Sequence, residues 1–173
     1  MGLSIGITGG IMMFTMFVSL LLIPPILDKT LAVSHTGNER IAIDDNIIKT
    51  QLSIEDIIAI EAKDDVTFTI LNTGTEKIWD FAKFDVFITY DRLNPTGTIT
   101  EKLDFDLSCP PLTSSWCINQ IIDDFLEPNI LNYNEGLVVD VILGDKIDNN
   151  GLVRIIVSAD NGVVATGSIQ AQQ

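Results

Sequence analysis

Charge is distributed along this chain in two blocks. Residues 2–27 contain no Asp, Glu, Lys, Arg or His and are mostly apolar, whereas every such side chain of the 173-residue protein lies from Asp28 onward. The hydrocarbon core of a bilayer is about 30 Å thick and is crossed by about 20 helical residues. Ile5–Leu27 supplies this length, and the Pro24-Pro25 pair disfavours further regular helix. We therefore expect residues 1–27 to form a transmembrane anchor helix.

A cleavable secretory signal is the alternative to an anchor. Such a signal has a basic start, an apolar run of about 7–15 residues and a small-residue cleavage site. This chain has no Lys or Arg before the run, the run is longer, and Leu31–Ser34 is a poor cleavage site. These features favour an uncleaved, single-pass anchor.

The orientation of this anchor follows from the rest of the chain. Only Lys29 lies close to the span, so the positive-inside rule gives little information. The pI near 4.1, the net charge of −14 and a predicted disulfide favour an exterior, oxidising location for the C-terminal part. We expect a cell-membrane protein whose C-terminal domain is extracellular.

Three glycines at the start of the chain are spaced by four residues. Gly2, Gly6 and Gly10 would share one face of a helix, where a second transmembrane helix can approach closely. The same spacing is frequent in membrane helices in general. Packing of a second helix and mere tolerance of the glycines both remain open.

Beyond the anchor, residues 28–50 predict a spacer and residues 51–173 a single β domain. Residues 28–50 are polar and lack a sustained apolar period, whereas apolar and polar residues alternate in short runs after Leu52. The irregular segment Ser108–Asn134 has room for a helical turn over Ile121–Leu126. The predicted strands cover residues 52–60, 66–71, 84–90, 99–105, 137–143, 152–158 and 163–169.

About seven short strands separated by turn residues predict an all-β fold. We expect an Ig-like β-sandwich preceded by the single transmembrane helix. A β-barrel is the less favoured alternative.

The only two cysteines, Cys109 and Cys117, lie in the irregular segment. In an exported chain this pair favours a disulfide over free buried thiols. The pair is not typical of a metal site, because it lacks both a CxxC spacing and neighbouring histidines.

The sequence gives little support for catalysis, cofactors or nucleic-acid binding. The only histidine, His35, lies in the spacer, outside the folded domain, and no glycine-rich phosphate loop is present. The acidic loop Asp145–Gly151 has a composition like that of a calcium loop, but its register places Lys146 at the first ligand position. A net charge of −14 repels phosphate. We expect a non-enzymatic protein with no cofactor, no metal and no nucleic-acid partner.

Several short motifs resemble those of a known family. They are the opening Met1-Gly2-Leu3-Ser4 before an apolar helix, Asn72-Thr73-Gly74 after an alternating strand, Phe84-Asp85-Val86-Phe87, and Pro128–Gly136 before a Val-rich strand. In these motifs the chain resembles the archaellum accessory proteins of the FlaF and FlaG type and the Ig-like domain of the archaellin superfamily. It departs from the family at Asn134-Glu135-Gly136, where members often carry Pro-Gly-Glu, and in the insert from Cys109 to Cys117. It also lacks the basic residue and glycine that precede the helix in processed filament subunits.

The resemblance implies a stator role in the archaellum, in which an extracellular Ig-like domain binds S-layer protein. It also implies self-association as a dimer or filament, or association with a related accessory protein. The last two predicted strands are the candidate edge for self-association, through Val153, Ile155, Val163 and Ile169.

Two other functions remain open. One is an archaellin- or pilin-like filament subunit. The other is a generic surface-binding ectodomain for a solute or glycan, which should show a concave site ringed with aromatic residues. The aromatic residues Trp79, Trp116, Tyr90 and Tyr133 are too scattered in the sequence to argue for such a site.

Overall fold

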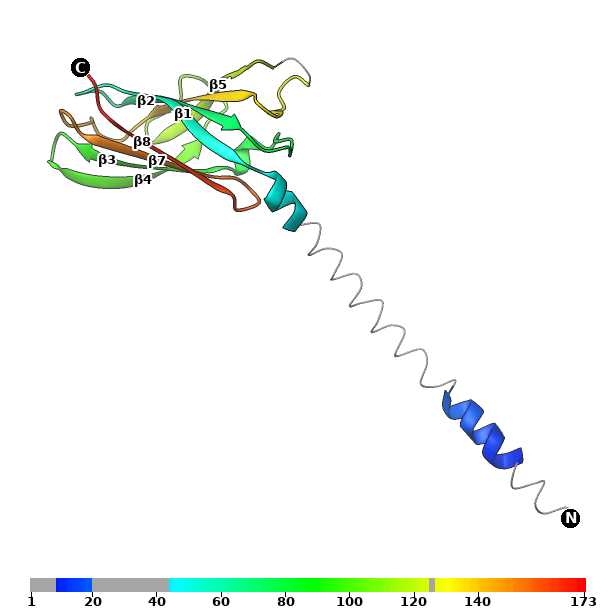
Figure 1. Ribbon diagram of the computed structural model, residues 1–173. Helices are drawn as coiled ribbons and strands as arrows, with labels where there is room; N and C mark the ends of the chain where they lie inside the picture. Colours follow the sequence, from blue (N-terminus) through cyan, green and yellow to red (C-terminus); the bar gives the residue numbers. More distant parts are fainter. Residues whose placement is uncertain (1–8, 20–43, 125–126) are drawn as a thin grey trace, which may run out of the picture. The chain divides into compact units, whose positions relative to one another are not determined.

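The computed structural model describes residues 9–19, 44–124 and 127–173 of the chain (Figure 1). The chain divides into two compact units, Met1–Asp44 and Asp45–Gln173. In the first unit residues 9–19 are helical and include Gly10, and their apolar side chains are largely exposed. Among the described residues, no helix has both the length and the apolar character needed to cross a membrane. Gly2, Gly6 and most of the predicted anchor and spacer lie outside the described residues.

The second unit is built almost entirely from β-strands, so the predicted all-β class is confirmed. A helical turn at residues 44–49 leads into the first strand, and one short 3-10 helix, η1, covers Phe81–Lys83. The strands are β1 (Leu52–Ala59), β2 (Asp65–Asn72), β3 (Asp85–Arg92), β4 (Gly97–Phe105), β5 (Ser115–Ile122), β6 (Gly136–Ile142), β7 (Leu152–Ser158) and β8 (Val164–Gln170).

The strands form two antiparallel groups of four, as the layers in Figure 1 show. One group has the order β1-β2-β6-β5 and the other the order β4-β3-β7-β8. This is the immunoglobulin order A-B-E-D and C′-C-F-G. A short parallel pairing of β4 with β5, at Asp104 with Ser115 and Phe105 with Trp116, joins the groups into one eight-stranded sheet.

The opposite border of the sheet is also nearly closed. The backbone N–H of Glu61 donates to the carbonyl of Gln172, and the N–H of Gln172 donates to the carbonyl of Ala59, so the end of β1 meets the C-terminus. A Cβ on Gly167 of β8 would come within 2.9 Å of side-chain atoms of Ile54 and Ile57 in β1. The predicted fold was a sandwich of about seven strands. The domain instead has eight strands in one sheet that nearly closes on itself, like a flattened barrel.

The strands predicted with clear alternation are present. Val66, Phe68 and Ile70 of β2 are buried, as are Val86 and Ile88 of β3. The hairpin of β7 and β8 pairs in continuous register from Leu152 with Gln170 to Ser158 with Val164. Alternation places one apolar row of each strand inside the barrel, where burial of these rows stabilises the fold.

The predicted helical turn over Ile121–Leu126 is wrong where the structure describes it, because Ile121 and Ile122 belong to β5. The sequence did not predict β5, because the alternation of apolar and polar residues is interrupted in this strand. The pairing with β6 shifts between Ile118 and Gln120, leaving Asn119 as an extra, bulged residue. Before the bulge, Trp116 and Cys117 are both buried although they are neighbours in the chain, and Cys117 is bonded to Cys109.

A buried tyrosine connects the two groups of strands near the parallel pairing. The hydroxyl of Tyr90 in β3 donates to Glu101 Oε1 in β4 (2.7 Å) and accepts the backbone N–H of Asp145 (3.0 Å). Glu101 Oε2 accepts the N–H of Gly144 (3.1 Å) and the hydroxyl of Ser114 (3.4 Å). Burial and the bond to Glu101 raise the pKa of the Tyr90 hydroxyl well above its usual value. This network fixes the loop after β6 and the start of β5 to the β3–β4 hairpin.

Candidate functional site

The loop between β2 and β3 is anchored to the rest of the domain at its middle and at its end. Ile78 exchanges two backbone hydrogen bonds with Leu131, at 2.8 and 3.2 Å, and its side chain is buried. Phe81 and Phe84 are also buried, with their ring centroids 6.0 Å apart in an edge-on arrangement. Lys83 forms an ion pair with Asp80 at 2.8 Å. The segment between Ile78 and Phe81 is therefore held in place from both sides.

Trp79 lies in this fixed segment and faces solvent. Its side chain is 63% exposed, whereas the other tryptophan, Trp116, is fully buried and packs against Phe105 with the two rings tilted by 52°. A large exposed aromatic side chain on a well-anchored loop is typical of a contact residue. The sequence did not single out Trp79, because the spacing of Ile78, Phe81 and Phe84 gives no sign that the residue between them faces solvent.

A hollow lies on each side of Trp79. The larger one, of about 350 Å³, is lined by Phe81 and by Ile118, Asn119 and Gln120 of β5, together with Asp124 and Asn129. The smaller one has a volume of about 150 Å³. Its polar lining includes Asn46, Thr50, Glu76, Asp80, Asp160 and Asn161. Trp79 belongs to both linings, so it forms a ridge between two mainly polar hollows.

Amide side chains form a large part of the polar lining beside Trp79. Asn161 Nδ2 donates to Asn46 Oδ1 (2.8 Å) and to Thr50 Oγ1 (2.7 Å), and Asn119 Nδ2 donates to Asp140 (2.6 Å). The side-chain amides of Gln120 and Asn129 make no hydrogen bond to another described residue. This arrangement leaves both donors and acceptors available to a ligand.

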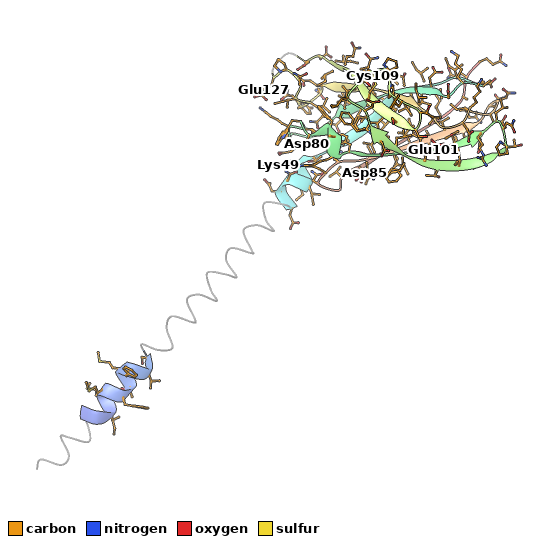
Figure 2. The ribbon with its side chains drawn as sticks, turned by 180° about the vertical axis from the view of Figure 1, so that it is seen from behind. Lys49, Asp80, Asp85, Glu101, Cys109 and Glu127 are labelled. Carbon is orange, nitrogen blue, oxygen red and sulfur yellow. A yellow bond between two sulfur atoms is a disulfide. The ribbon has the colours of Figure 1, made fainter. Side chains whose placement is uncertain are left out.

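The charges around the ridge are mostly acidic. The two lysines of the smaller hollow, Lys77 and Lys83, are engaged in ion pairs with Glu127 and Asp80. Asp80, Glu127 and Lys49 lie at the same end of the β domain, where the helical residues 44–49 enter it (Figure 2). The ridge and its hollows, which we call the Trp79 surface, therefore favour neutral or cationic ligands over anions.

Two of the four motifs that carry the family resemblance, Asn72-Thr73-Gly74 and Pro128–Gly136, meet in the structure and have a structural role. Asn72 is fully buried, and its Nδ2 donates to the carbonyls of Glu76 (2.8 Å) and Leu131 (3.0 Å). Its Oδ1 accepts the N–H of Gly74 at 3.0 Å, and its backbone exchanges hydrogen bonds with Asn134 and Glu135. Asn72-Thr73-Gly74 and the segment before β6 thus form one hydrogen-bonded unit.

The same loop also clamps the segment that leads into β1. The N–H groups of Thr73 and Gly74 donate to the carbonyl of Gln51, and those of Thr75 and Glu76 donate to the carbonyl of Lys49. A Cβ on Gly74 would overlap the Lys49 carbonyl oxygen and the Gln51 nitrogen. Only glycine allows this close backbone approach.

Cys109 and Cys117 are joined by a disulfide, with Cα atoms 5.6 Å apart. The loop that carries Cys109 is held by Asp106, whose carboxylate accepts bonds from the N–H and hydroxyl of Ser108 and from the N–H of Leu112. These bonds lower the pKa of the Asp106 carboxyl. Asp140 lies next to the two sulfurs, but sulfurs bonded to each other are not thiolate ligands for a metal.

Of the four residues predicted for a self-association edge, only Ile169 lies on a terminal strand of the sheet, and association through that strand stays a prediction. Strand β7 pairs with β3 on one side and β8 on the other, so Val153 and Ile155 are buried in the core. Val163 precedes β8, and Ile169 is half-buried against the core. In the described part of the chain, β1 and β8 end the sheet and are linked only by the Ile60–Gln172 bridge. The other edges without a strand partner are those of β4 before Asp104 and of β5 after Trp116.

Comparison with known proteins gives matches only at the level of three-dimensional structure. No protein-family model matches the chain, and no curated protein matches it. The archaeal flagellum of Methanospirillum hungatei strain JF1 matches with a TM-score of 0.63 and 11% identity, over 96% of this chain and 93% of the flagellum chain. The archaellum periplasmic stator protein complex FlaF and FlaG from Sulfolobus acidocaldarius matches with a TM-score of 0.50 and 15% identity, over 69% of this chain and 89% of that chain.

The archaellum periplasmic stator protein FlaG from the same organism, solved alone, matches with a TM-score of 0.48 and 14% identity, over 69% of this chain and 99% of that one. At such low identities a likeness establishes the fold. The chain thus has the fold found in archaellum filament and stator proteins, and the family resemblance predicted from its motifs is confirmed at this level.

Proposed function

We propose that this chain is a membrane-anchored component of the archaellum, a stator whose Ig-like domain lies outside the cell and binds S-layer protein. The observation that carries the proposal is the fold, which is shared with a protein complex described as an archaellum stator and with an archaeal flagellum chain. The uncharged segment before Asp28 supports the anchor, and the acidic domain supports an exterior location.

A stator needs rigid attachment and contact surfaces rather than an active site. The Trp79 surface and the unpaired edge of β4 before Asp104 offer such contacts. An unpaired edge accepts a strand from another chain by backbone hydrogen bonds, which also supports self-association or association with a related accessory protein.

The experiment is gene deletion combined with localisation of the tagged full-length chain. For a stator, we expect deletion to abolish swimming while filaments are still assembled. The chain should stay with membranes after carbonate extraction and should recover S-layer protein from the solubilised envelope. A tagged segment of residues 1–50, which lacks the β domain, should remain in the membrane and recover none. Normal swimming of the deletion strain would contradict the proposal.

An archaellin-like filament subunit is the second candidate function. It is favoured by the flagellum match, which extends over 96% of this chain, compared with 69% for the stator complex. In that case the chain should be a main component of filaments sheared from cells, and deletion should remove the filaments. Finding the chain only in the envelope would exclude this role.

A further inference from the structure

We propose that the Trp79 surface is a carbohydrate-binding site for a neutral pyranose, with the sugar ring stacked on the Trp79 indole. This inference concerns a ligand site on the β domain and does not rest on the archaellum assignment.

The first argument is the presentation of the indole. Trp79 is 63% exposed although its neighbours Ile78 and Phe81 are buried, and the Ile78–Leu131 backbone pairing holds the loop. A flat aromatic face packs well against the C–H groups on one side of a pyranose. Because the loop is already fixed, little conformational freedom is lost when a ligand binds.

The second argument is the chemistry of the two hollows. A pyranose presents hydroxyls around its edge, and each hydroxyl both donates and accepts hydrogen bonds. Side-chain amides offer the same dual capacity. Gln120 and Asn129 supply it on one side of Trp79. On the other side Asn46 supplies a donor, its Nδ2 amide, because its Oδ1 already accepts from Asn161 and Thr50. A few convergent polar groups beside an aromatic surface are typical of small-ligand sites.

The third argument is charge. Asp124 and Asp160 line the hollows without an ion-pair partner among the described residues, while Lys77 and Lys83 are both paired with acids. The surface therefore repels anionic sugars such as uronates and accepts neutral ones.

A protein strand is the competing occupant, and the structure favours it less. Strand addition needs a regular edge, but β5 is bulged at Asn119, in the middle of the larger hollow. The carboxylates that would attract a basic peptide are outnumbered by amides.

The test is direct binding of the full-length chain, in micelles of a detergent with a sugar-free head group, to an immobilised saccharide panel. The panel contains oligosaccharides of mannose, glucose, galactose and N-acetylglucosamine, with oligoglucuronate as the anionic member. We expect at least one neutral saccharide to bind and oligoglucuronate not to bind. The saccharide that binds should also change the fluorescence of Trp79, while buried Trp116 serves as an internal reference.

Two substitutions at Trp79 and one at Tyr133 test whether the saccharide binds at the Trp79 surface. Trp79→Ala should weaken binding of that saccharide about tenfold or more, because the stacking contact is lost, and Trp79→Phe should retain part of it. Tyr133→Ala is the matched control, since Tyr133 is 59% exposed but lines neither hollow. Both alanine variants should melt at the same temperature as the wild type.

Three results would overturn the proposal. They are no binding to any panel saccharide, equal binding by the wild type and Trp79→Ala, or equal loss in Tyr133→Ala. A fluorescence change with an oligolysine or oligoarginine peptide but with no saccharide would assign the surface to a cationic protein segment instead.

Discussion

Asn72 is a polar residue at the centre of an apolar domain, and its side-chain amide is fully used. It holds the carbonyls of Glu76 and Leu131 and the N–H of Gly74, all in a buried setting. Asn72→Ala would leave the Glu76 carbonyl without a partner and would remove one of the two hydrogen bonds at the Leu131 carbonyl and at the Gly74 N–H. A buried group left unpaired costs about 1–3 kcal/mol, and each of the other two lost bonds costs about 1 kcal/mol. We expect the free energy of unfolding to fall by about 3 kcal/mol or more, measured by urea denaturation.

Thr73→Ala is the matched control for this variant. The Thr73 hydroxyl makes one accessible hydrogen bond to the Gln51 carbonyl at 3.2 Å, so its loss should cost about 1 kcal/mol or less. Equal losses in the two variants would contradict the role assigned to Asn72.

The buried hydroxyl of Tyr90 leads to a prediction about the stability of the domain at alkaline pH. Its pKa is raised in the folded state, above the ordinary tyrosine value of about 10, chiefly by burial and also by the bond to Glu101. The folded state then keeps a proton that the unfolded state loses, so this contribution to stability is complete below about pH 10 and is lost as pH rises further. We therefore expect the difference in the free energy of unfolding between the wild type and Tyr90→Phe to become smaller as the pH rises from about 8 to about 11. Urea denaturation at each pH measures this difference.

The control for the pH series is Tyr133→Phe, which changes an exposed tyrosine. This variant should follow the wild type at each pH. A gap between wild type and Tyr90→Phe that stays constant across the series would show that the Tyr90 proton is not linked to folding.

At the scale of single elements, a strand could be predicted where apolar and polar residues alternate regularly along it. Strands such as β2 and β3 have one buried and one more exposed row, and their alternation in the sequence was sufficient to find them. Strand β5 was missed because the bulge at Asn119 interrupts the period. The exposure of Trp79 and the closure of the sheet depend on contacts between distant segments, which no local pattern reports.

The disulfide yields a prediction for β5, because it ties the start of this strand to the preceding loop. On the chain-entropy model, closing so short a loop stabilises by about 2–3 kcal/mol. Reduction of the wild type should therefore lower its melting temperature. The double variant Cys109→Ser, Cys117→Ala should melt at a similarly lowered temperature and be insensitive to reductant. An unchanged melting temperature on reduction would show that the bridge does not stabilise the fold.

At the scale of the whole molecule, the net charge of −14 opposes self-association between identical domains. Salt screens this repulsion, with a Debye length that falls from above 10 Å to below 5 Å between about 0.05 M and about 0.5 M. We expect light scattering of residues 45–173 to give a larger mean mass at the higher salt concentration. Sucrose of equal osmolality should have no such effect, and a monomer under both salt conditions would contradict self-association through this domain.

The four backbone bonds that tie Lys49 and Gln51 to the loop after β2 determine how a mechanical load enters the domain. Tension arriving along the N-terminal segment acts first on these bonds, which must break before the outermost strand can be peeled away. The loop that begins with Asn72-Thr73-Gly74 thus protects β1 from forces applied through the N-terminal segment.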